Sequence, residues 1–389
     1  MPVSLAVVSL VIQALLIIHC IKTGRNQIWI WVLALLSFAG VIAYVAAELI
    51  PDLLRSRTTQ RAVRGVKKAI DPQATLRRYE SEARLTSNVS ANQRYADELI
   101  RQGKPAEAIE VYRSALEKDK TNMALVLRLG AAQVLAGALD DADQTLAKVI
   151  REIPNSAEAE FFIGRISFAR GRTADALAHF DRAIGLDISK GEYHLYVARS
   201  TWELGNFART MEEADVAIKR DPSLGDAFWV RAMVRLRLGQ VRDSLKDLDK
   251  ALVLNPARID AYAVRGDCYE QLRQLPEAIA AYRMALDKDG TRGVWWYRLA
   301  GLMSDAGDHG QAESALKHAV EAGEKADPLP HWLPDAYRLS GENAERTNNR
   351  QAAIRYYKRY AEISQTNAID YAPVMKKLRE WGVELGEDE

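Results

Sequence analysis

Arginine and aromatic side chains recur at matched positions near the middle of this 389-residue chain. Arg165 and Arg199 stand 34 residues apart, and Phe168 and Trp202 share the same interval. Guanidinium groups bind carboxylate or phosphate through paired, charge-assisted hydrogen bonds, and aromatic rings anchor protein ligands. If these residues share one surface, their chemistry suits an extended or helical peptide that carries a carboxylate or a phosphate.

Residue patterns that support catalysis or metal binding are missing from the sequence. The two cysteines, Cys20 and Cys268, cannot form a disulfide framework or a four-thiolate zinc site, and the 6 histidines show no metal-ligand spacing. No phosphate-binding glycine loop and no Gly-x-Ser-x-Gly elbow occurs. The net charge is +1, and basic residues form no stripe that would favour nucleic acid. We therefore predict a protein that is not an enzyme, needs no cofactor or metal, and does not bind nucleic acid.

The interval of 34 also governs small residues along most of the chain. One series holds glycine at six of its seven places: Gly103, Gly137, Gly171, Gly205, Gly239, Arg273 and Gly307. Two further series of mainly small residues begin at Ala108 and at Ala115. Series that keep a constant register over seven successive places predict one structural unit, repeated without insertion and stacked into a single elongated body.

Residues 123–156 serve as the type unit of this repeat. Leu127 and Gly130 share one helical face, Gly137 interrupts the helix, and a second apolar face begins at Ala142. A small residue at the eighth place lets the two helices approach closely. Glycine on the ladder suits the left-handed conformation that commonly ends a helix. Each unit is therefore predicted to be a helix, a turn and a second helix.

This unit resembles the tetratricopeptide repeat, over about three-quarters of the chain. The resemblance implies an all-α, right-handed solenoid of about seven to eight helix-turn-helix repeats with a C-terminal cap helix. We expect seven repeats within residues 89–326. A divergent eighth repeat and the cap helix are expected within residues 327–389, after an insertion that contains Asp327-Pro-Leu-Pro330.

In this family the first helix of each repeat lines the concave face, so the resemblance implies which side chains line the groove. They are apolar, aromatic or basic in repeats three to five: Phe161, Arg165, Phe168, Leu195, Arg199, Trp202, Trp229 and Met233. Asp267 and Glu270 make the following wall acidic. The alternative is that these side chains pack between adjacent repeats and are buried. The lysine and asparagine clamp that some relatives use for chaperone C-termini is not matched, since Gln93 and Asp97 hold the corresponding places.

Two apolar runs precede the repeats, at residues 3–21 and 28–50. Each has about the 20 residues that a helix needs to cross a bilayer. We therefore predict a two-span membrane hairpin over residues 1–50, with a re-entrant hairpin or one cleaved span as alternatives. Six cations within residues 55–68 favour a cytoplasmic C-terminal part. The basic segment 51–88 is predicted to be a helical linker, which either lies beside anionic lipid or is simply solvated.

The hairpin resembles the N-terminal segment of bacterial cardiolipin synthases of the phospholipase D superfamily. The resemblance rests on residues 19–31 (His-Cys-Ile-Lys-Thr-Gly-Arg-Asn-Gln-Ile-Trp-Ile-Trp), residues 40–44 (Gly-Val-Ile-Ala-Tyr) and residues 48–51. The catalytic His-x-Lys-x4-Asp motif of that superfamily is absent. The resemblance therefore implies a bacterial membrane anchor and not lipid synthesis.

Together these patterns predict a scaffold, anchored in the bacterial inner membrane by two spans, whose cytoplasmic repeats recruit a partner through the groove. The expected partner is a protein or peptide with acidic side chains or a C-terminal carboxylate, and membrane lipid is a second expected contact. The alternative is an assembly or quality-control factor for envelope lipid or polysaccharide enzymes, acting partly through its membrane spans.

Overall fold

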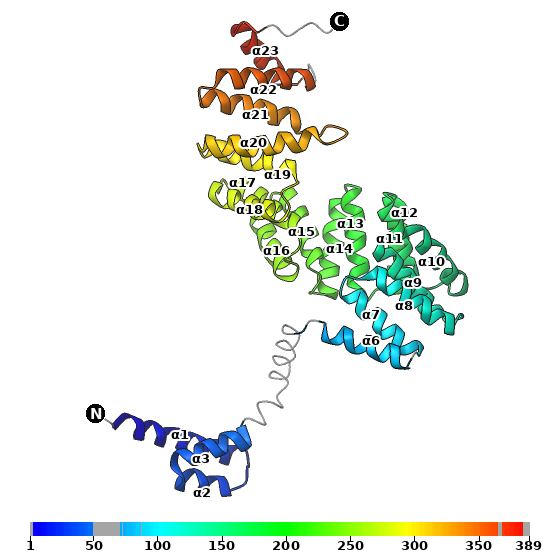
Figure 1. Cartoon of the computed structure of the whole chain (residues 1–389), viewed down its shortest axis with the longest axis vertical. Coiled ribbons are helices and arrows are strands. Elements are labelled where there is room, and N and C mark those ends of the chain that lie inside the picture. The colour runs from blue at the N-terminus through cyan, green and yellow to red at the C-terminus, as the bar shows by residue number, and fades with distance from the viewer. Residues whose placement is uncertain (1–2, 50–70, 72, 87, 365–367, 384–389) are drawn as a thin grey trace. The chain divides into compact units, whose positions relative to one another are not determined.

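The computed structural model describes residues 3–49, 71, 73–86, 88–364 and 368–383. Every regular element in these ranges is a helix, so the prediction of an all-α fold is confirmed (Figure 1). The chain divides into two compact units, residues 1–125 and residues 126–389. The basic stretch 51–70, in which we predicted a helix that is either lipid-associated or solvated, lies outside the described residues.

The predicted membrane hairpin is not supported. The second apolar run is divided into the α-helices α2 (Ile28–Leu35) and α3 (Ser37–Tyr44) and a π-helix, η1 (Val45–Leu49). Eight helical residues extend about 12 Å, whereas a bilayer core is about 30 Å thick. No helix among the described residues is long and apolar enough to cross a membrane. The predicted two-pass inner-membrane location is therefore wrong, and the resemblance to cardiolipin synthases finds no support.

Polar contacts join α1 (Val3–Lys22), the loop that follows it and these short helices. The Nδ1 atom of His19 lies 3.0 Å from the hydroxyl of Tyr44, which is buried. Glu48 forms an ion pair with Arg25 and accepts a hydrogen bond of 2.9 Å from the indole of Trp29. Glu48, the one acidic residue of the apolar runs, is thus paired within the protein.

Residues 89–363 form consecutive helix pairs. The first seven pairs each begin 34 residues after the one before, and the eighth begins at Leu333, 40 residues after Gly293 and behind the insertion. The first helices are α7 (Val89–Arg101), α9 (Met123–Ala136), α11 (Ala157–Ala169), α13 (Gly191–Glu203), α15 (Gly225–Arg237), α17 (Ile259–Gln271), α19 (Gly293–Asp305) and α21 (Leu333–Arg346). The second helices are α8 (Pro105–Lys118), α10 (Leu139–Glu152), α12 (Thr173–Leu186), α14 (Phe207–Arg220), α16 (Val241–Leu254), α18 (Leu275–Lys288), α20 (His309–Glu324) and α22 (Arg350–Ile363). The short helix α6 (Ala74–Thr86) precedes them and packs on α7, and α23 (Tyr371–Glu380) follows at the place predicted for the cap helix.

The ladder residues all end a first helix in the left-handed conformation. At Gly103, φ is +72°, and the backbone N–H of Lys104 reaches back to the carbonyl of Leu99. This is the Schellman arrangement, which satisfies the last carbonyls of a helix. Arg273 takes the same conformation with φ of 59°, so the departure from glycine leaves the turn unchanged. Asn348, with φ of 57°, ends α21 in the same way.

The small residue at the eighth place permits close contact between the helices of a pair. A Cβ atom on Gly164 would lie 2.6 Å from the Phe180 ring, and one on Gly266 would lie 2.6 Å from the Tyr282 ring. Both distances are shorter than carbon atoms tolerate. Phe180 is fully buried, as are Ala142 and Ala176 of the second small-residue series. The repeat core is therefore built from large rings seated on small residues.

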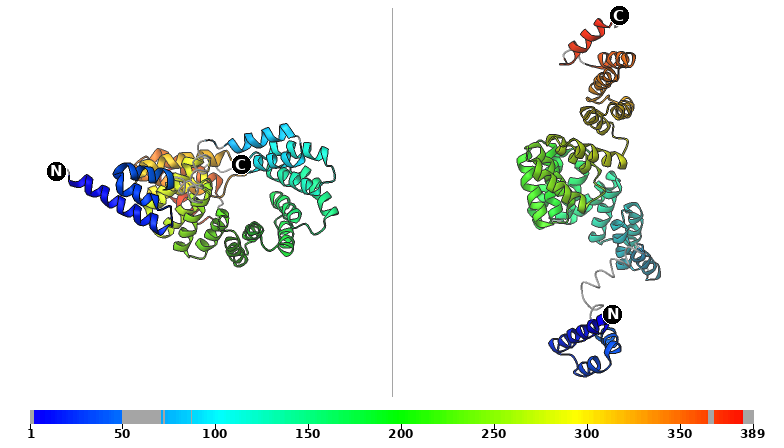
Figure 2. Two further views of the ribbon diagram at one scale, coloured as in Figure 1. Left: turned by 90° about the horizontal axis from the view of Figure 1, so that it is seen from below. Right: turned by 90° about the vertical axis from the view of Figure 1, so that its left-hand side faces the viewer.

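Within residues 126–389 the pairs follow one another in chain order, and the first helices of successive pairs approach each other (Figure 2). Direct contacts join α13 to α15, α15 to α17, and α19 to α21. Elements lie closest on the inner side of a curved stack. The first helices therefore line the concave face, and α11, α13 and α15 carry the predicted groove residues.

Candidate functional site

Two arginines and two aromatic rings form an alternating stack across α11 and α13. The guanidinium carbon of Arg165 lies 5.1 Å from the centroid of the Tyr196 ring, and that of Arg199 lies 5.0 Å from the same centroid. Arg199 also lies 5.3 Å from the Phe168 ring. Tyr196 thus contacts both guanidinium groups, which come from adjacent repeats. We call Arg165, Phe168, Tyr196 and Arg199 the arginine–aromatic stack.

The two arginines of the stack lack acidic partners. Among the residues that the structure describes, neither guanidinium takes part in a hydrogen bond or an ion pair. Stacking on aromatic rings still fixes the planes of the guanidinium groups, because the cation is attracted to the ring face. Their N–H donors remain available to a carboxylate or phosphate.

Two of the predicted groove residues belong to the core. Phe161 is 1% exposed and packs against the rings of Phe180, Tyr193 and Tyr196. Leu195 is 4% exposed and lies in a cluster with Val230. These two side chains are buried between adjacent repeats, which was the alternative to a groove position. They offer almost no surface to a ligand.

The remaining predicted residues are half-buried on α13 and α15. Trp202 packs edge-on against Phe207, with ring centroids 5.1 Å apart. Trp229 is covered by the guanidinium of Arg258 at 4.3 Å, and its indole nitrogen is buried without a hydrogen-bond partner in the described part of the chain. Met233 packs in the same cluster as Leu195 and Trp229. The structure therefore brings Arg165, Phe168 and Arg199 together, while Trp229 and Met233 lie in the next repeat.

Tyr196 is the residue that the sequence reasoning missed. It stands at the sixth place of its repeat, directly after Leu195, which holds the fifth place and was assigned to the groove. Its ring lies 5.3 Å from Phe180 in the core and also faces the two arginines, so one side chain serves both roles. A tyrosine at this place, between two arginines in matched positions, was the available signal.

A cavity of about 350 Å³ adjoins the stack between α13 and α15. Arg199 and Tyr196 line one part of it, and Glu192, at the start of α13, lines another. Loss of water around the Glu192 carboxyl raises its pKa, and the nearby charge of Arg165 opposes that shift. Positive and negative groups therefore share this cavity.

Acidic and basic side chains occur together at α17. Asp267 and Glu270 line a depression of about 620 Å³ together with Arg273 and Arg298. Burial raises the pKa of Asp267, which also accepts a hydrogen bond from the hydroxyl of Tyr282. Burial likewise raises the pKa of Glu270, against the charge of Arg298. Arginines lie beside both acids, so the opposite charges in this depression offset each other. The arginines of the stack, in contrast, form no ion pair with a described residue.

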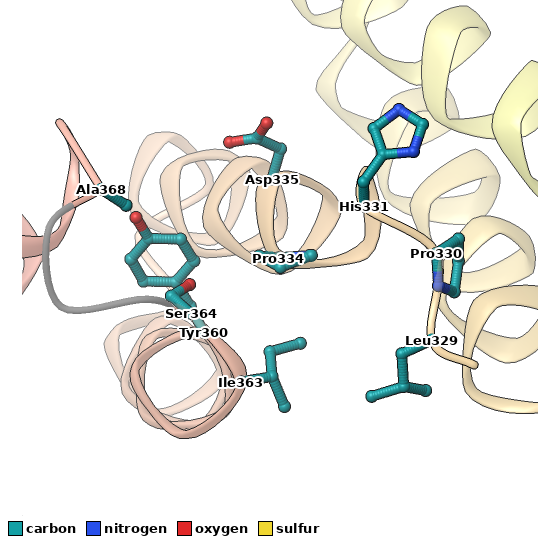
Figure 3. A pocket seen from close by; sticks show the side chains of 9 residues that line it. All are labelled: Leu329, Pro330, His331, Pro334, Asp335, Tyr360, Ile363, Ser364 and Ala368. Carbon is teal, nitrogen blue, oxygen red and sulfur yellow. The ribbon is translucent and has the colours of Figure 1, made fainter. Parts of the chain in front are cut away.

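A further hollow of about 350 Å³ lies between α21, α22 and the insertion that precedes α21 (Figure 3). Its wall is mostly apolar and includes Leu329, Pro334 and Ile363, with His331 and Asp335 at its edge.

No group of three or more histidine, cysteine or acidic residues in the described part of the chain could hold a metal ion. The arginine–aromatic stack therefore carries the most distinctive chemistry on the described surface.

Comparison with known proteins identifies the repeat. Residues 99–162 match one model of the tetratricopeptide repeat, and residues 140–193, 163–225 and 230–292 match a second. No curated protein matches the sequence.

Solved structures share the fold. Over 79% of this chain, the structure is similar to a chain of the APC/C hetero-tetramer Cut9–Hcn1, with 14% identity and a TM-score of 0.57. The similarity spans only 60% of that chain. Over 57% of this chain and 97% of the other, it is similar to pilF of Pseudomonas aeruginosa, with 15% identity and a TM-score of 0.50. At such identities the likeness concerns the fold alone. Together with the matching repeat models, it confirms the prediction of tetratricopeptide repeats.

Proposed function

We propose that this chain is an interaction scaffold whose concave face binds a protein or peptide segment with an anionic group. The proposal proceeds from the tetratricopeptide repeats of residues 99–225 and 230–292. The observation that carries the proposal is the pair of guanidinium groups, Arg165 and Arg199, held on the Tyr196 ring without acidic partners among the described residues. In the next repeat, by contrast, Arg231 forms an ion pair of 2.6 Å with Asp247.

The bound group is a carboxylate, from an acidic side chain or from a peptide C-terminus. A carboxylate accepts two parallel hydrogen bonds from one guanidinium, which gives direction as well as affinity. The half-buried Phe168 and Trp202 add apolar area beside the charges. The proposal assigns no catalytic activity to the site. The alternative role in envelope enzyme assembly relied on membrane spans, and we do not retain it because no described helix could form one.

Fluorescence anisotropy with labelled decapeptides tests the proposal. One peptide carries three glutamates and an amidated C-terminus, a second is neutral with a free C-terminal carboxylate, and a third is neutral and amidated. We expect the first or second to bind and the third to fail, with affinity falling as salt is raised. Equal binding of all three peptides would show that the anionic group is not recognised.

Replacing Tyr196 tests the stack itself. Tyr196→Ala removes the ring that both guanidinium groups contact. A cation–π contact contributes about 0.5–1 kcal/mol when exposed and about 2 kcal/mol when desolvated, so the carboxylate peptide should bind about 5- to 30-fold more weakly. Tyr196→Phe keeps the ring and should retain affinity within about twofold. Equal losses in both variants would mean that the hydroxyl, and not the ring, matters.

A further inference from the structure

The cavity between α13 and α15 carries two opposite charges at a fixed separation. Glu192 and Arg199 both line it, and both belong to α13. They are seven residues apart, which places them two helical turns apart, or about 10 Å along the helix axis. No ion pair joins the two side chains in the described structure.

Neither charge has a hydrogen-bonded or ion-paired partner among the described residues, although the charge of Arg165 acts on Glu192 from nearby. The other acid of the cavity behaves differently, since Asp226 is paired with both the Nε and the Nη2 of Arg258. The cavity therefore presents one open acidic site and one open basic site.

Leucine side chains supply an apolar part of the cavity wall. Leu224 and Leu254 line the cavity between α15 and the end of α16. The aliphatic stem of a lysine or arginine packs on such surface while its charged end stays polar. The cavity thus fits a cationic side chain better than a small inorganic cation.

We propose that this cavity reads a dipolar motif in the partner, in which a carboxylate binds Arg199 and a lysine or arginine one to three residues away binds Glu192. The inference rests on the proposed function and specifies its ligand. An extended peptide rises about 3.3 Å per residue, so such a spacing, with the length of the basic side chain, spans the gap of about 10 Å. The polarity of α13 then sets the direction in which the partner lies along the groove.

Glu192 has another evident role, because a carboxylate in the first turn of a helix stabilises the helix dipole. That role predicts a change of stability and no change of ligand preference. Asp260 occupies the same first-turn place in α17 and lines none of the cavities described above. Asp260→Asn is therefore the matched control for Glu192→Gln.

The test is an anisotropy titration of the full chain with four decapeptides: acid and lysine together, acid alone, lysine alone, and neither. We expect the wild type to bind the first about tenfold more tightly than the second, from one added charge-assisted contact. Glu192→Gln should reduce this ratio to about one, because binding of the dipolar peptide weakens, whereas Asp260→Asn should keep the ratio. Glu192→Lys should prefer a peptide in which glutamate replaces the lysine.

The outcomes separate the two proposals. An unchanged ratio in Glu192→Gln, or a wild type that binds the acid-only and dipolar peptides equally, overturns the dipolar motif and leaves the proposed function standing. Absence of binding to both acid-containing peptides overturns the proposed function, and the dipolar motif with it. Charge exchange in Glu192→Lys gives a gain of binding, which loss of folding cannot imitate.

Discussion

A double variant, Arg165→Glu with Arg199→Glu, is expected to bind the carboxylate peptide at least about 100-fold more weakly than the wild type. Hydrogen bonds to charged groups contribute about 1.5–3 kcal/mol each, so the loss of two amounts to about 3–6 kcal/mol. Every 1.4 kcal/mol is about a tenfold change in affinity, and the introduced carboxylates also repel the ligand. Anisotropy with the labelled peptide measures the effect.

The control for this variant changes net charge equally but away from the groove. Arg151 is exposed at the end of α10, Arg242 is exposed at the start of α16, and neither lines a cavity described above. Arg151→Glu with Arg242→Glu should leave peptide affinity within about threefold, since salt screens exposed charges that lie outside the binding cavity. If both double variants lose affinity to the same extent, the peptide responds to overall charge and the stack is not its binding site.

Phe180→Ala is expected to cause the largest loss of stability of any single substitution named here, about 3–5 kcal/mol. The Phe180 ring is fully buried, lies 5.7 Å from Phe161 and 5.3 Å from Tyr196, and occupies the space left by Gly164. Removing it leaves a cavity at the centre of repeat three. Urea unfolding, with hydrogen exchange read over α11–α14, measures the loss in that part of the chain.

The same variant connects the core to the site. Tyr196 rests on Phe180 and faces the two arginines. The stack should therefore loosen in Phe180→Ala, and peptide affinity should fall even at urea concentrations at which the chain is still folded. Phe228→Ala in α15 is the comparison, because Phe228 is only half-buried and its ring contacts Arg231. A loss in Phe180→Ala no larger than that in Phe228→Ala would contradict the assignment of Phe180 as the repeat core.

The repeat could be predicted in detail because its signals are local. Positive φ at the ladder residues follows from the need to end each first helix, and even Arg273 adopts it. Close packing at Gly164 follows from the presence of a large ring, Phe180, on the facing helix. Both constraints act within one unit of 34, and each favours a particular residue type at a fixed place of the unit.

The groove could be predicted only in part because burial there depends on the neighbouring repeat. Phe161 is buried by Tyr193 and Tyr196, which belong to the following unit, and no signal within its own unit reports this. Tyr196 was missed for the same reason. The N-terminal prediction failed differently: hydropathy counts apolar residues but does not register the interruption of the helix at Leu36, where φ is −98° and ψ is 13°.

Selection from a random peptide library displayed on phage tests the central claim most directly, because it assumes no ligand. The wild-type chain and the Arg165→Glu, Arg199→Glu variant would be presented side by side, and the selected pools sequenced. We predict that the wild type enriches peptides with aspartate, glutamate or a free C-terminal carboxylate, and that the variant loses these and enriches lysine and arginine. Enrichment of the same sequences by both proteins would contradict the claim that Arg165 and Arg199 form the binding site.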